Sequence, residues 1–185
     1  SDAPPDSRSR AEAFARKAIE LDGQLAEPHA TLGQLHYSKW QWAEAETQYK
    51  RAIEINPNYA TARHWYSVLL YALARKEEGH AMITRAHEID PMSSIISQNF
   101  AQMLEMKGDH QAAIEVCQKI IELDPNFPGG HFTIGWLYLK SGRNDEAIAE
   151  FQKSVELGNR HSYSIADLGA AFAASGRTKE ALELA

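Results

Sequence analysis

The chain has 185 residues, of which 44% are hydrophobic and 24% charged, with 11 glycines and 7 prolines. This composition predicts one or two folded domains and excludes disordered and collagen-like chains. Acidic residues outnumber basic ones by 25 to 19, and a net charge of −6 disfavours nucleic acid as a partner, because phosphates require cationic contacts.

The termini and the single cysteine narrow the class of protein further. Cys117 cannot form an intrachain disulfide or a cysteine-rich zinc module, and it leaves a cytoplasmic or periplasmic location open. The longest apolar run, residues 68–74, is far shorter than the roughly twenty residues of a membrane span, so no membrane insertion is predicted. Residues 1–8 lack the apolar core of a secretion signal and are predicted to be a flexible leader before one domain at 9–185.

An internal repeat of 34 residues organises the remaining chain. Its joints are the dipeptides Asn56-Pro57, Asp90-Pro91 and Asp124-Pro125. Small residues recur at the same interval in one column, at Ala11, Ala45, Gly79, Ala113, Ala147 and Ala181. A second small column holds Gly33, Ser67, Ala101, Gly135 and Gly169. A period of this length predicts a repeat array, and the small columns predict helices that touch backbone to backbone.

Each unit is predicted to be a helical hairpin. Residues 9–25 form the second helix of an incomplete first unit, complete units begin near residues 26, 60, 94 and 128, and a partial unit begins near 162. Within each unit, large apolar residues at helical spacing mark one face of each helix. Glycines at 108, 142 and 176 stand where tight helix-to-helix turns are expected.

Both ends of the array resemble cut ends. The sequence starts inside one unit and stops within a helix, with Ala181 and Leu182 on the face that a further helix would cover. We therefore expect a fragment of a longer protein, and self-association through the end repeats stays an open alternative.

These units resemble the tetratricopeptide repeat. The resemblance covers about residues 9–185 and is best at 26–59. There, six of the family's eight anchor positions are occupied, by Leu32, Gly33, Ala45, Tyr49, Ala52 and Pro57. Trp40 departs from the pattern, because it replaces the turn glycine. The resemblance implies an all-α, right-handed superhelical solenoid of antiparallel helix pairs, whose first helices line a concave groove.

The same resemblance implies a non-catalytic module that binds a peptide or a helix of a partner protein in that groove. The residues predicted to face it are Gln34, Tyr37, His64, Val68, Tyr71, Gln98, Asn99, Gln102, Phe132, Trp136 and Leu139, with Glu105 and Asp167 beside them. Aromatic and amide side chains suit an extended peptide, through stacked apolar area and hydrogen bonds to its backbone. For Val68, Tyr71, Phe132 and Trp136 the alternative is packing between neighbouring first helices.

The sequence shows no motif for binding a terminal carboxylate or a metal ion, or for catalysis. The positions that match the family's clamp for a terminal carboxylate carry no lysine or arginine, and an anion would need such charge-assisted partners. None of the eight histidines has another four residues away, so no metal site is predicted. A phosphate loop and a nucleophile with a nearby base are also missing, so the sequence predicts no enzyme activity and no cofactor. Cys117 is predicted to be a small buried hydrophobe.

Residues 56–66 suggest a second hypothesis. Their amino-acid sequence resembles that of the repeat arrays attached to bacterial signalling proteins such as transcriptional regulators, cyclases and kinases. The alternative function is therefore a regulatory or sensory segment of a larger signalling protein.

Overall fold

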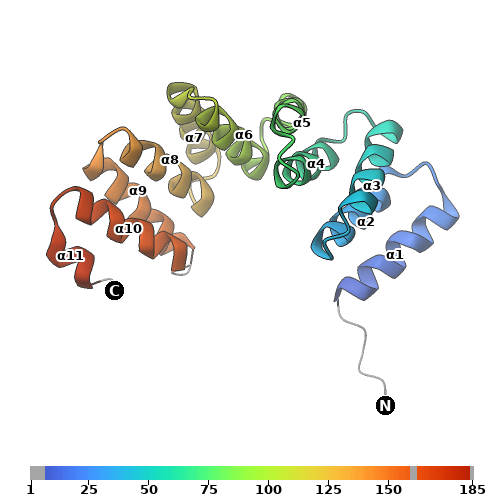
Figure 1. Ribbon diagram of the computed structural model, residues 1–185, viewed down its shortest axis with the longest axis horizontal. Coiled ribbons are helices and arrows are strands. Elements are labelled where there is room, and N and C mark those ends of the chain that lie inside the picture. The colour runs from blue at the N-terminus through green and yellow to red at the C-terminus, as the bar shows by residue number, and fades with distance from the viewer. Residues whose placement is uncertain (1–6, 159–161, 184–185) are drawn as a thin grey trace, which may run out of the picture. The chain divides into compact units, whose positions relative to one another are not determined.

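The computed structural model describes residues 7–158 and 162–183, with helices as the regular elements of these residues (Figure 1). The chain divides after Asp90 into two compact units, which are described separately. Most of the predicted leader lies outside the described residues, and the first helix already begins at Ser7. No described helix has the length and apolar character that would let it cross a membrane.

The first unit is built from sequential helix pairs. Its described helices are α1 (Ser7–Leu21), α2 (Ala26–Ser38), α3 (Trp42–Ile55), α4 (Ala60–Ala72) and α5 (Lys76–Ile89). Helix α2 packs on α3 and α4 packs on α5, while α3 also contacts α4. The core of this unit surrounds Tyr49, Tyr66 and Leu69.

The second unit repeats this arrangement. Its described helices are α6 (Ser94–Met106), α7 (His110–Leu123), α8 (Pro128–Lys140), α9 (Asn144–Leu157), α10 (Ser162–Ala174) and α11 (Thr178–Glu183). Each helix packs on the next, and the first helices α6, α8 and α10 also contact one another in turn. This pairwise packing confirms the all-helical repeat fold, while the handedness of a superhelix stays a prediction.

Glycines in the second small column make room for aromatic rings. A Cβ added at Gly33 would lie 2.5 Å from Cε1 of Tyr49, and one added at Gly135 would lie 2.9 Å from Cδ1 of Phe151. The expected contact of backbone with backbone is therefore wrong at these positions, because a ring of the second helix fills the space. Interiors packed at this density leave no room for an added methyl group.

Two kinds of hydrogen bond recur at the joints between hairpins. A carboxylate or amide oxygen before the proline position accepts from the backbone N–H two residues later, as at Asn56 (3.0 Å) and Asp124 (3.2 Å). These are Asx turns, which explains the residue type that precedes each proline. The fourth residue of the following helix then donates to the proline carbonyl. The bonds join Arg63 to Pro57 at 2.8 Å, Ser97 to Pro91 at 3.1 Å and His131 to Pro125 at 3.0 Å.

The turns inside the hairpins require a left-handed backbone. Gly108, Gly142 and Gly176 have φ angles of 84°, 73° and 76°, as expected for a residue that follows a helix. Trp40 and Ala74 occupy the same repeat position with φ angles of 62° and 58°. Replacing the glycine therefore leaves the turn intact, at a conformational cost of roughly 1–2 kcal/mol for each residue.

Candidate functional site

The first helices carry two columns of side chains that differ in exposure. The open column holds Gln34, Val68, Gln102 and Trp136, of which all but the half-buried Val68 are exposed. The inner column, four residues earlier, holds Ala30, His64, Gln98 and Phe132, all buried or half-buried. The predicted groove residues therefore divide between a solvent-facing stripe and a stripe that packs on neighbouring helices.

The predicted residues of the first unit are mostly engaged in packing. Gln34 is exposed and accepts a hydrogen bond from the hydroxyl of Tyr49 at 2.9 Å. Tyr37 packs edge-on against Trp42, with ring centroids 5.3 Å apart. The ring of Tyr71 lies about 3.2 Å from the Cβ position of Gly79, and burial raises the pKa of its phenol to about 12. Tyr71 therefore packs on α5, the second helix of its own hairpin, and not between neighbouring first helices as the packing alternative had it.

His64 departs from the prediction of a groove-facing side chain. It is buried on α4, and this desolvation lowers its pKa below the ordinary histidine value. The reason is its place in the inner column, where Ala30 is also buried. His64 therefore packs inside the first unit.

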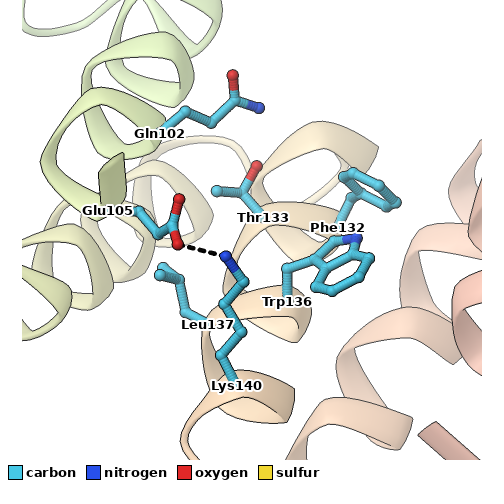
Figure 2. Close-up of a pocket in the computed structure, with 7 residues that line it drawn as sticks. All are labelled: Gln102, Glu105, Phe132, Thr133, Trp136, Leu137 and Lys140. Atoms are coloured by element: carbon cyan, nitrogen blue, oxygen red, sulfur yellow. Dashed lines mark hydrogen bonds and ion pairs between the residues drawn. The ribbon is translucent and has the colours of Figure 1, made fainter. Parts of the chain in front are cut away.

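A cavity of about 330 Å³ opens between α6 and α8 in the second unit (Figure 2). Four predicted residues, Gln102, Glu105, Phe132 and Trp136, line it. The other lining residues are Thr133, Leu137 and Lys140. The cavity thus contains Gln102 and Trp136 from the open column. It also contains Phe132 and Lys140, which lie one helical turn before and after Trp136 on α8.

Aromatic packing fixes one wall of the cavity. Phe132 and Trp136 are four residues apart on α8 and project from the same side of the helix in Figure 2. Both contact the buried ring of Phe151 edge-on, with centroids at 6.0 and 6.3 Å. The indole Nε1 of Trp136 donates to Asp167 Oδ2 on α10 at 3.2 Å. A ring held by these contacts loses little conformational freedom when a ligand stacks on it.

Polar groups from both α6 and α8 complete the lining. The Lys140 ammonium donates to the Glu105 carboxylate across the cavity, as the dashed line in Figure 2 marks. Gln98 Nε2 donates to Thr133 Oγ1 at 3.2 Å, which leaves the Thr133 hydroxyl hydrogen available to a ligand. The exposed Gln102 offers both an amide donor and a carbonyl acceptor at the rim.

Two predicted residues of the second unit lie away from this cavity lining. Asn99 donates through Nδ2 to the Ile95 carbonyl of its own helix, at 3.0 Å. Leu139 is half-buried and packs against the core around Phe151. Sequence reasoning chose Leu139 and missed Lys140, although the spacing of Phe132, Trp136 and Lys140 at intervals of four marks the face that lines the cavity.

A second cavity of about 330 Å³ belongs to the first unit. It is lined by Tyr37, Ser38, Trp40, Trp42 and Ala72 at the turn between α2 and α3. Trp42 packs against the core of the first unit, and the Trp40 ring lies edge-on against it at 5.1 Å while Trp40 remains 77% exposed. None of the described residues that line this cavity is charged.

Metal and thiol chemistry are not visible in the described residues. Within residues 7–158 and 162–183, no group of three histidine, cysteine or acidic side chains is arranged to hold a metal ion. Cys117 is fully buried, as predicted, and burial raises the pKa of its thiol to about 12. A thiol in this state is a packing group, because the reactive form is the thiolate.

The pairwise packing of the described helices defines a helical-repeat protein. Family models of the tetratricopeptide repeat match residues 26–59 and residues 104–164, which together make up more than half of the chain. The chain therefore belongs to the tetratricopeptide-repeat proteins, a generally non-catalytic family that binds protein partners.

Solved structures share this fold. YrrB, described as a tetratricopeptide-repeat protein with an unusual peptide-binding site, is 22% identical with a TM-score of 0.68, over 92% of this chain and 88% of that chain. PilF from Pseudomonas aeruginosa is 20% identical with a TM-score of 0.78, over 94% and 79%. A chain of the APC/C hetero-tetramer Cut9-Hcn1 is 14% identical with a TM-score of 0.85, over 96% and 35%. At these identities the likeness concerns the fold.

Two further comparisons bear on function. No curated protein matches the chain significantly. The solved structures named above give no link to bacterial signalling proteins, so the signalling hypothesis stays a prediction from residues 56–66.

Proposed function

We propose that this chain is a non-catalytic interaction module that binds an extended peptide segment of a partner protein, and that the cavity between α6 and α8 is its main contact site. The observation that carries this proposal is the partly exposed Trp136, held in place at the edge of an apolar cavity. Its ring is 36% exposed and is fixed by Phe151 and Asp167. Rigid, half-exposed tryptophans beside a cavity are typical of the residues that dominate binding energy.

The lining supports a peptide better than a small polar ligand. Phe132, Trp136 and Leu137 supply apolar contact, while Gln102 and Thr133 can bond to a peptide backbone. The peptide-binding description of YrrB, which shares the fold, is consistent with this use of the surface.

The test is selection of a randomised nonapeptide phage library on the purified chain, followed by fluorescence anisotropy with a selected peptide. Trp136→Ala is expected to weaken binding by about thirtyfold, corresponding to a loss of about 2 kcal/mol. Leu123→Ala is the control, because Leu123 is also an exposed large apolar residue, on α7, and does not line the cavity. It is expected to bind as the wild type does.

Circular dichroism separates loss of binding from loss of fold, since both variants are expected to keep the helical signal. Equal binding by Trp136→Ala and wild type would contradict the assignment of the cavity. A library that yields no binding peptide would contradict the proposed function itself.

A further inference from the structure

We propose that Trp136, at the edge of the cavity, and Asp167, its hydrogen-bond partner on α10, together bind the guanidinium group of an arginine in the partner segment. This inference deepens the proposed function, because it names the chemistry of one residue in the bound peptide. It rests on the geometry of the two side chains, on charge, and on an arrangement that the chain uses elsewhere for its own arginines.

Asp167 supplies a carboxylate of which one oxygen accepts a hydrogen bond from Trp136. Its Oδ2 accepts the indole N–H of Trp136 at 3.2 Å, which leaves Oδ1 and the remaining lone pairs available. Among the described residues, no lysine, arginine or histidine forms an ion pair with it. Partial burial raises the pKa of Asp167, although the bond from Trp136 opposes this. A cation placed here would gain a charge-assisted hydrogen bond.

Trp136 supplies the second half of the subsite. Its indole edge is bound to Asp167 and contacts Phe151, and the side chain is still 36% exposed. Arginine is attracted to an aromatic face, where its planar group stacks while its N–H groups point outward in the plane. One guanidinium can therefore lie against the indole and donate to Asp167 at the same time.

The chain holds two of its own arginines in this way. Arg143 lies 4.0 Å above the ring of Tyr138 and donates to Glu146 at 2.6 Å. One repeat later, Arg177 lies 4.7 Å above the ring of Phe172 and donates to Glu180 at 2.8 Å. Trp136 and Asp167 form a third pair of an aromatic ring and a carboxylate, for which the described residues supply no arginine.

Charge around the cavity favours a cation over an anion. The ammonium of Lys140 is already bound to Glu105, so an acidic ligand would have to displace that carboxylate. Counting Lys140, Glu105 and Asp167 together, this region carries one net negative charge, and an acidic residue would be repelled. The occupant beside Trp136 and Asp167 is therefore a basic residue, and the flat donor geometry selects arginine over lysine.

The experiment compares nonapeptides selected by phage display on the wild-type chain with those selected on Asp167→Asn. Asparagine keeps an oxygen that accepts the Trp136 N–H and removes the charge. Asp145→Asn is the matched control, because Asp145 is an exposed carboxylate at the start of α9. Wild type and Asp145→Asn are expected to enrich arginine at one position, and Asp167→Asn is expected to lose this enrichment.

Fluorescence anisotropy then measures a selected peptide and the same peptide with citrulline in place of that arginine. Citrulline keeps the shape of the side chain and removes its charge. We expect about tenfold tighter binding of the arginine peptide by wild type, and a ratio near one for Asp167→Asn.

Each outcome separates the inference from the proposed function. Selected peptides without arginine enrichment, acidic peptides in their place, or an arginine preference that persists in Asp167→Asn would overturn the inference while peptide binding itself stands. Failure to select any peptide on the wild-type chain would overturn both.

Discussion

Gly135 and Gly169 occupy the same repeat position, yet their surroundings differ. A Cβ on Gly135 would meet the ring of Phe151 at 2.9 Å, whereas no atom of the residues that the structure describes lies within 4 Å of a Cβ on Gly169. Gly135→Ala is therefore expected to destabilise the chain by about 1–3 kcal/mol through overpacking. Gly169→Ala is expected to stabilise it by up to about 1 kcal/mol, because alanine is the better helix former. Urea unfolding followed by circular dichroism measures both, and a shift of the same sign in the two variants would contradict this account.

At the residue scale, sequence reasoning succeeded where the repeat itself fixes the environment. Burial of Cys117 followed from its repeat position and is confirmed. The exposure of His64 and Leu139 could not be predicted in this way. Neighbouring positions on a helix face different directions, so an error of one position in the assigned face exchanges an exposed side chain for a packed one. The orientation of each helix against its neighbours decides which positions are packed.

Glu46 connects three consecutive helices of the first unit. Its carboxylate accepts from the Tyr66 hydroxyl at 2.7 Å and from Arg75 at 2.9 Å, and it pairs with Lys50 at 2.8 Å. Burial by itself would raise the pKa of Glu46, but the hydrogen bonds from Lys50, Tyr66 and Arg75 lower it to about 2. The carboxylate is thus held in its charged form between α3, α4 and the start of α5.

The stability that Glu46 provides is expected to depend on pH. Its folded-state pKa lies below the ordinary value of 4.5, so the contribution is complete above about pH 4.5 and is lost as the pH falls toward 2. Glu46→Gln is expected to lower the free energy of unfolding by about 1–2 kcal/mol at pH 7, and the difference from wild type should shrink on acidification.

Urea unfolding at pH 7, 4 and 3 checks this dependence, with Glu44→Gln on the exposed side of α3 as the control. A difference between Glu46→Gln and wild type that stays constant from pH 7 to pH 3 would argue against the charged network.

At the element scale, the helix pairs and joints were predictable because proline, glycine and small residues mark them at fixed intervals. The turn at residues 38–42 was harder, since Trp40 stands where glycine is expected. The structure shows the same left-handed backbone at Trp40 and Ala74 as at Gly142. Packing of the flanking helices therefore imposes the turn even where the residue type opposes it.

Over the whole molecule, each compact unit contains its own buried aromatic anchor. Tyr49 and Phe151 are both fully buried at equivalent repeat positions. Phe151→Ala is expected to cost about 3–5 kcal/mol and to accelerate amide hydrogen exchange in residues 91–183, while residues 7–90 stay protected. Tyr49→Ala is the reciprocal variant and should show the opposite pattern. Equal loss of protection in both units would mean that the chain unfolds as one cooperative body.

The all-helical repeat fold was predictable from periodicity, whereas the cavity was only partly so. Gln102, Glu105, Phe132 and Trp136 were named from their positions, but the ion pair between Glu105 and Lys140 depends on side chains that reach between helices. Pairings of this kind are set by the spacing of α6 and α8, which a 34-residue period does not specify.

The bond to each proline carbonyl bears on how such arrays diverge. A guanidinium, a hydroxyl and an imidazole occupy one equivalent site and satisfy the same acceptor in three successive joints. The requirement at that site is a hydrogen-bond donor that reaches the preceding proline carbonyl, and chemically different side chains can meet it. Arginine, serine and histidine are chemically dissimilar, yet the joint keeps the same hydrogen bond with each of them. The sequence of one repeat can therefore differ greatly from that of the next while the turn stays the same.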